Sequence, residues 1–119
     1  MINDPGKLFL TLRNSATAAH VAHLSTTSYA AHKALNEYYD EIIDLADRFA
    51  ESWMGLNDGK RISFTGTSFK LETDATKMLK GVRAEIESAQ KECDDSMIKQ
   101  ILDDAKELVC DTIYLLTLK

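Results

Sequence analysis

The sequence predicts an all-α protein, a four-helix bundle formed by a single domain that covers residues 1–119. Three observations predict it. Apolar residues recur with the helical period in four separate segments, three of the five glycines lie in one connecting segment, and 45% hydrophobic with 28% charged residues is typical of a globular chain. A chain of this length can bury a core without disulfides or metals.

The first two predicted helices are joined by the hydroxyl-rich run "STTS". Pro5 suits the first turn of a helix that continues to about Leu24. The serines and threonines suit an N-cap for a second, longer helix that ends at Gly55. The predicted inward residues of the first helix are Leu8, Leu12, Ala16, Ala19 and His23, and those of the second are Leu35, Tyr38, Ile42, Leu45, Ala46, Phe49 and Trp53.

Residues 55–72 are predicted as an irregular connection, with a small hairpin as an alternative, because glycines alternate there with short β-favouring runs. A third helix follows a cap at Thr73 or Asp74, and "CDDS" separates it from a fourth. The predicted inward residues are Leu79, Val82, Ile86 and Ala89 in the third helix, and Ile98, Ile101, Leu102, Ala105, Leu108, Val109, Thr112 and Leu116 in the fourth.

The lengths of the connections predict the directions of the helices. Short connections make the first and second helices antiparallel, and likewise the third and fourth. The long connection between the second and third helices lets these two run parallel. The expected order is therefore up-down-down-up rather than a simple up-down array.

Composition excludes several classes of function. The net charge of −5 argues against nucleic-acid binding and against anionic membrane surfaces. The sequence has no run of eighteen apolar residues and no signal-peptide pattern, which predicts a cytoplasmic protein. Cys93 and Cys110 are expected to be reduced thiols in the interior. Phosphate-loop, dinucleotide and nucleophile-elbow motifs are missing, so the sequence offers no basis for hydrolase chemistry.

A polar stripe follows the second helix on a side of its own. At ~100° per residue, Asn36, Asp47 and Glu51 fall within about 100° of His32 in one direction, whereas the apolar stripe centres about 90° from His32 in the other direction. Asp47 and Glu51, at i and i+4, can share one hard cation. His32 lies fifteen residues from Asp47, or ~22 Å along the axis. One ion therefore cannot bind both within one chain, and the stripe is either a solvated surface or an interface with a second chain.

The pattern of His20, His32 twelve residues later, and D-x-x-x-E at Asp47 and Glu51 resembles the Dps-type miniferritins of the ferritin-like superfamily. The resemblance implies a ferritin-like bundle with a long crossover between its second and third helices, assembled as a homo-oligomer of two-fold dimers, up to a dodecamer. It implies iron held by His20 and His32 of one subunit with Asp47 and Glu51 of the other. The implied activity is ferroxidase, the oxidation of Fe(II) by peroxide or oxygen, with iron storage and protection from oxidative stress.

The chain also departs from that family. Asn36 stands where the family has an acid, which removes one anionic ligand, and Val21 stands where it has Trp. A second resemblance is to short phage-encoded Dps-like proteins, which share a stretch "H-L-x-T-x-S-Y-A-x-H-x-A-L", here residues 23–35. In that stretch His23 is an alternative ligand to His20, although a hydrogen-bonded core histidine is the other interpretation.

Two functional expectations follow, and whether the protein is an enzyme stays open between them. One is an iron-binding and iron-oxidising miniferritin subunit. The other is a non-catalytic phage structural or interaction protein with a vestigial metal site. DNA binding, the namesake activity of the family, is not expected, because residues 1–15 offer only Lys7 and Arg13 and the C-terminus only Lys119.

Overall fold

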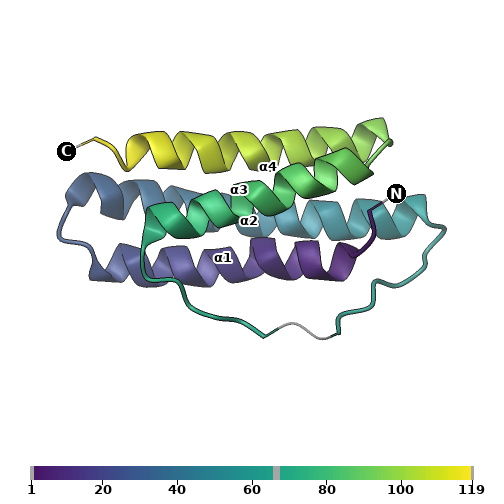
Figure 1. Ribbon diagram of the computed structural model, residues 1–119, viewed down its shortest axis with the longest axis horizontal. Helices are drawn as coiled ribbons and strands as arrows, with labels where there is room; N and C mark the ends of the chain where they lie inside the picture. Colours follow the sequence, from purple (N-terminus) through teal and green to yellow (C-terminus); the bar gives the residue numbers. More distant parts are fainter. Residues whose placement is uncertain (1, 66–67, 119) are drawn as a thin grey trace.

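The computed structural model describes residues 2–65 and 68–118, and this part of the chain contains four helices and no strand (Figure 1). The prediction of an all-α protein is confirmed. None of the helices in the described part combines the length and the hydrophobicity of a membrane span. The helices are α1 (Pro5–Ser25), α2 (Tyr29–Leu56), α3 (Ala75–Glu92) and α4 (Ser96–Leu115).

Each helix begins at a short polar side chain that accepts a hydrogen bond from the backbone N–H three residues later. This contact satisfies one of the N–H groups that a helix leaves without an internal partner. Asp74 fills this position for α3, which decides between the two caps considered from the sequence. The four caps and their N–H donors are Asp4 with Lys7, Ser28 with Ala31, Asp74 with Lys77, and Asp95 with Ile98.

The four helices pack side by side, and the directions follow the expected up-down-down-up order (Figure 1). Helix α1 packs against α2 and α3, and α4 packs against the same two helices, so α1 and α4 lie on opposite sides of the array. The connections 26–28 and 93–95 are short turns. The crossover between α2 and α3, in its described residues 57–65 and 68–74, lies below α1 in this view and returns the chain to the end where α2 began.

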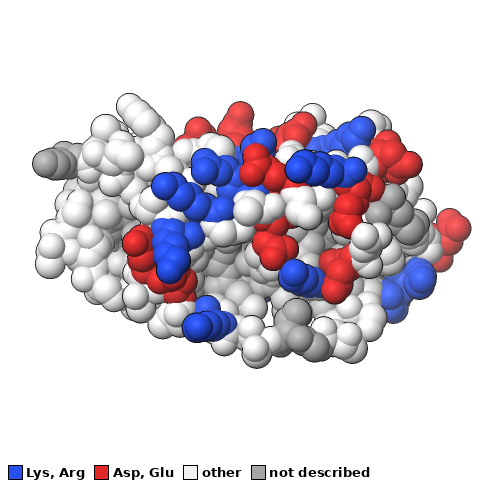
Figure 2. Space-filling view, in the orientation of Figure 1, with Lys and Arg blue, Asp and Glu red and all other residues white. Residues whose placement is uncertain are grey.

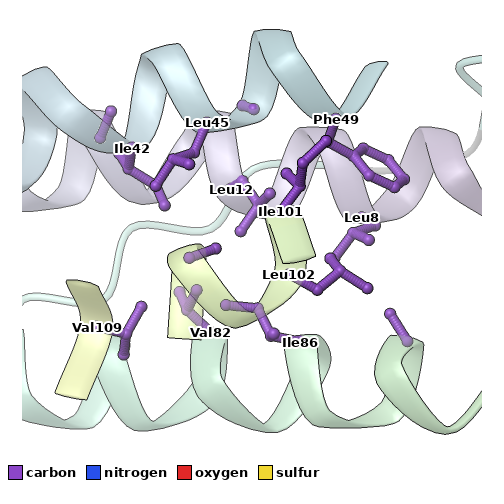
Figure 3. Close-up of a cluster of buried hydrophobic side chains, with 14 of the residues drawn as sticks. Leu8, Leu12, Ile42, Leu45, Phe49, Val82, Ile86, Ile101, Leu102 and Val109 are labelled. Carbon is purple, nitrogen blue, oxygen red and sulfur yellow. The ribbon is translucent and has the colours of Figure 1, made fainter. Parts of the chain in front are cut away.

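A single core lies between the helices, and side chains from all four helices converge on it (Figure 3). Every residue predicted to point inward from α1, α2 and α3 is buried. Leu108 and Leu116 of α4, also predicted inward, are only half-buried. Leu108 instead lines a surface groove between α2 and α4, and Leu116 follows the last residue of its helix. Cys93 is buried and Cys110 half-buried, both as free thiols.

The crossover is held against the first turns of α1. Ile62 is buried, and the ring of Phe64 meets the ring of Phe9 edge to face at 5.5 Å. The backbone of Ser63 approaches Gly6 so closely that a β-carbon on Gly6 would lie 2.1 Å from the Ser63 carbonyl oxygen. The hairpin considered for this connection is not formed by the part of it that the structure describes, and Gly66 and Thr67 lie outside that part.

A buried polar pair links α1 to α2 inside the core. The Ser15 hydroxyl donates to the Leu12 carbonyl oxygen at 2.6 Å, so its hydrogen is committed. The Tyr38 hydroxyl, 2.7 Å from Ser15 Oγ, therefore donates to that oxygen. Tyr38 is fully buried, and its burial raises the pKa of the phenol above the ordinary value, an effect that the Ser15 hydrogen bond only partly offsets.

This raised pKa predicts a loss of stability in alkali. Above about pH 10 the unfolded chain releases the Tyr38 proton, whereas the folded chain retains it. Deprotonation then favours the unfolded state, and Tyr38 should lower the free energy of unfolding by about 1.4 kcal/mol per pH unit in this window. Urea unfolding at a series of pH values should give a steeper decline for the wild type than for Tyr38→Phe. Tyr114→Phe, which alters an exposed phenol, should keep the wild-type slope.

Candidate functional site

All three histidines of the chain meet where α1 turns into α2. His20 and His23 lie in the last turns of α1, and His32 lies in the first turn of α2. Because the turn between these antiparallel helices is short, the rings of His23 and His32 stack with centroids 3.6 Å apart and planes 20° apart. The ring of His20 lies next in the row, 5.8 Å from that of His23.

His23 and His32 form a pair of reciprocal hydrogen bonds, which we call the histidine clasp. His23 Nδ1 donates to the carbonyl oxygen of His32 at 2.6 Å, and His32 Nδ1 donates to the carbonyl oxygen of His23 at 2.9 Å. A carbonyl oxygen only accepts, so each Nδ1 carries a hydrogen, and in the neutral ring the lone pair lies on Nε2. The clasp also gives a donor to one of the last carbonyl groups of α1, which have no helical partner.

Exposure separates the roles of the three rings. His23 is 8% exposed and hydrogen-bonded, so the prediction of a core histidine is confirmed. His20 and His32 are exposed. His32 therefore combines an oriented ring with access from outside, and His20 is accessible beside it. The structure brings both of the alternative ligands, His20 and His23, into the same cluster as His32.

Tyr39 is a member of this cluster that sequence reasoning missed. Its ring stacks on His20 with centroids 4.5 Å apart and planes 18° apart. Its hydroxyl donates to Asn36 Oδ1 at 2.6 Å, and Asn36 Nδ2 lies 3.5 Å from Asp40 Oδ2. The signal available in the sequence was spacing, since Tyr39 follows His32 by two helical turns and so lies on the same side of α2.

The Asn36 side chain is thus hydrogen-bonded to residues of its own chain. The amide oxygen that would have to serve as a ligand already accepts the Tyr39 hydroxyl. Its nitrogen, a donor only, cannot bind a cation. Asn36 thus orients Tyr39, and through it the ring that stacks on His20.

Asp47 and Glu51 are both exposed on successive turns of α2, as predicted, but one chain does not bring them to the histidines. The fifteen residues between His32 and Asp47 correspond to ~22 Å of helix. Accordingly, no group of three or more His, Cys, Asp or Glu side chains able to hold a metal ion exists within the described part of one chain.

Comparisons with known proteins place the chain in a family without assigning it an activity. It is 34% identical over 100 residues to a protein of Enterobacteria phage T4, the uncharacterized 14.6 kDa protein in the mobD-ri intergenic region, and the match covers 84% of this chain and 77% of the phage protein. No solved structure matches. The model of a family of unknown function, DUF5856, matches residues 23–116, a span that begins at the clasp and includes the carboxylates. The chain belongs to this family.

Proposed function

We propose that this protein is a Dps-type, ferritin-like four-helix subunit that binds iron between two copies and oxidises Fe(II) with peroxide or oxygen. The observation that carries the proposal is the orientation of His32. Its Nδ1–H is held by the His23 carbonyl, and its Nε2 lone pair is left for a ligand on an exposed side chain. Metal-binding histidines almost always donate their other ring N–H in this way.

A second copy supplies what one chain lacks. The histidines lie near the beginning of α2 and the carboxylates near its end. If two copies pack with their α2 helices antiparallel about a two-fold axis, the histidine end of each faces the carboxylate end of the other. The ~22 Å separation along the helix, which prevents a site within one chain, is then the separation between two equivalent sites.

The donor set fits iron. Two imidazole nitrogens from His20 and His32, with carboxylate oxygens from Asp47 and Glu51 of the second copy, form the mixed N and O shell that suits this metal. Fe(II) is here the substrate: two Fe(II) ions would each give one electron to a peroxide, which with two protons becomes two water molecules. The residues of this chain hold and orient the ion: the clasp fixes the His32 tautomer, and Tyr39 supports the ring of His20.

Replacing both carboxylates by amides tests this site. Asp47→Asn with Glu51→Gln keeps side-chain size and removes two negative charges from exposed positions, so the fold should be unchanged. We expect bound iron, measured by elemental analysis after anaerobic Fe(II) loading and gel filtration, to fall at least tenfold. Peroxide-dependent formation of Fe(III) should fall with it.

The matched control is Asp58→Asn with Asp94→Asn, which removes two exposed carboxylates outside the helices. This variant should bind and oxidise iron as the wild type does. Wild-type iron content in the Asp47/Glu51 variant would refute the site.

A non-catalytic interaction protein is the second candidate, and the Tyr39–Asn36 hydrogen bond favours it. Asn36 is neutral where the Dps-type pattern has an acid, so the shell lacks one anionic ligand and iron is held less firmly. Its amide oxygen also accepts a hydrogen bond within its own chain. The same experiment distinguishes the two candidates. A dimer that contains no iron and forms no Fe(III), in both the wild type and the control, supports the interaction protein.

A further inference from the structure

Five of the eight residues that line a surface groove between α2 and α4 carry carboxylates. Its cavity of about 340 Å³ has Leu45 and Leu108 among its lining residues. The charged residues around it are Glu41, Asp44 and Arg48 of α2 and Asp104, Glu107 and Asp111 of α4. Arg48 neutralises one of the five acids, through an ion pair with Asp104 at 3.5 Å. The groove therefore carries a formal charge of −4, one Arg against five acids.

No counter-charge for the other four acids is found within the described residues, which contain no further ion pair to this groove. Like charges gathered in a hollow raise the electrostatic free energy of the isolated chain. The cost is relieved when a surface of opposite charge covers the groove. An occupant of the groove should therefore carry a row of cations on a face narrow enough to enter between two helices.

Such a face exists on the same chain, along α3. Figure 2 shows Lys and Arg side chains over this helix, with Asp and Glu side chains among them. The acids of α3 are engaged at its flanks and at its end: Glu85 pairs with Lys7 of α1 at 3.5 Å, Glu87 pairs with Lys106 of α4 at 3.1 Å, and Glu92 accepts a hydrogen bond from Asn3. Lys80 and Lys91 are exposed on the same side of α3 and form no ion pair in the described part of the chain, and Glu87 between them is neutralised by Lys106.

Small residues make this side of α3 narrow. Gly81, Ala84 and Ser88 are exposed and lie between Lys80 and Lys91. Lys80 and Lys91 are eleven residues apart, ~16 Å of helix, and the unpaired Glu107 and Asp111 are four apart, ~6 Å. The flexible four-carbon stems of lysine can close this difference. The helix backbone can approach the groove closely where its side chains are short.

We infer that the acidic groove between α2 and α4 is an interface between copies of this chain, and that it receives the basic face of α3 of a second copy. Each copy has one groove and one basic face on different sides, so the contact is head to tail and can repeat around a closed ring. It is separate from the α1–α2 face that holds the histidines and does not rest on the iron site. The two contacts together can build an assembly larger than a dimer.

A charge-swap experiment tests this interface. Lys80→Glu with Lys91→Glu makes the face acidic, and Glu41→Lys with Glu107→Lys and Asp111→Lys changes the formal charge of the groove from −4 to +2. In each variant alone, the groove and the α3 face carry charge of the same sign. Its self-association should therefore weaken at least tenfold. In an equimolar mixture every groove meets a face of opposite charge. Light scattering after gel filtration at low salt should then show the wild-type mass restored, and added salt should dissociate it.

Two controls keep the result specific. Lys60→Glu with Lys70→Glu reverses two exposed charges in the crossover and should leave the assembly unchanged. Helical circular dichroism confirms that each variant is folded. The inference is overturned if the wild type does not exceed a dimer, if either variant associates as the wild type does, or if the mixture fails to restore the mass.

The two proposals fail in different ways. The charge-reversed variants should fall back to dimers that still bind iron, whereas Asp47→Asn with Glu51→Gln loses iron and leaves the head-to-tail contact intact. Dimers that bind iron but never assemble further would therefore refute only the groove.

Discussion

Replacing Gly6 by alanine should lower the free energy of unfolding by about 2 to 3 kcal/mol, because it adds a methyl group where the structure has no room. The new β-carbon would lie 2.1 Å from the carbonyl oxygen of Ser63 and 3.2 Å from its carbon. Both are backbone atoms, which cannot rotate away as a side chain can. The crossover must therefore move outward and take the buried Ile62 with it.

Gly55→Ala is the matched control, since a β-carbon there meets nothing within 4 Å. It lies in the last turn of α2 and should be neutral or stabilising by up to about 1 kcal/mol, because alanine restricts the unfolded chain. Urea unfolding followed by circular dichroism measures both variants. Equal midpoints for Gly6→Ala and the wild type would show that the crossover does not rest on α1.

Replacing Ser15 by alanine should cost about 1 to 3 kcal/mol, because it leaves the buried Tyr38 hydroxyl without an acceptor. Tyr38 is fully buried, so no water replaces the lost partner. Removing the hydroxyl as well, in Ser15→Ala with Tyr38→Phe, removes the unsatisfied group and should recover most of the loss. The double variant should therefore be more stable than Ser15→Ala alone.

A double-mutant cycle by urea unfolding measures this coupling. Tyr38→Phe alone should be the milder single change, because the Ser15 hydroxyl keeps its own acceptor, the Leu12 carbonyl. Additive losses in the double variant would mean that the two hydroxyls do not act as a pair. Thr17→Ala, on the exposed side of α1, should leave stability within about 0.5 kcal/mol of the wild type.

Most of the fold could be predicted because helices leave a local signal. The spacing of Leu8 and Leu12, or of Ile42 and Phe49, is set by the period of one helix and needs no knowledge of its neighbours. The caps are equally local, since Asp74 and Asp95 act on N–H groups three residues away. Leu108 fits the same pattern but is half-buried, because periodicity marks a side of a helix and not how closely a neighbour covers it.

The candidate site was predictable only in part, because its geometry depends on how two helices are rotated against each other. The resemblance in sequence suggested His20 and His32 as ligands, whereas the histidine clasp requires the turn between α1 and α2 to bring two backbone carbonyls into reach. The stack of Tyr39 on His20 depends on the same rotation. The path of the crossover left no periodic signal at all, since it is fixed by single contacts such as that of Gly6 with Ser63.

The crossover also determines at which end of the molecule each terminus lies. The N-terminus lies at the end of the 46 Å long array where α2 finishes, and the C-terminus lies at the opposite end, where α1 turns into α2 (Figure 1). Two dyes attached to the two termini of the same chain are therefore far apart. In the antiparallel pair that an iron site requires, the N-terminal dye of one copy comes close to the C-terminal dye of the other. Energy transfer between singly labelled copies thus distinguishes this pairing from a parallel one without any metal being present.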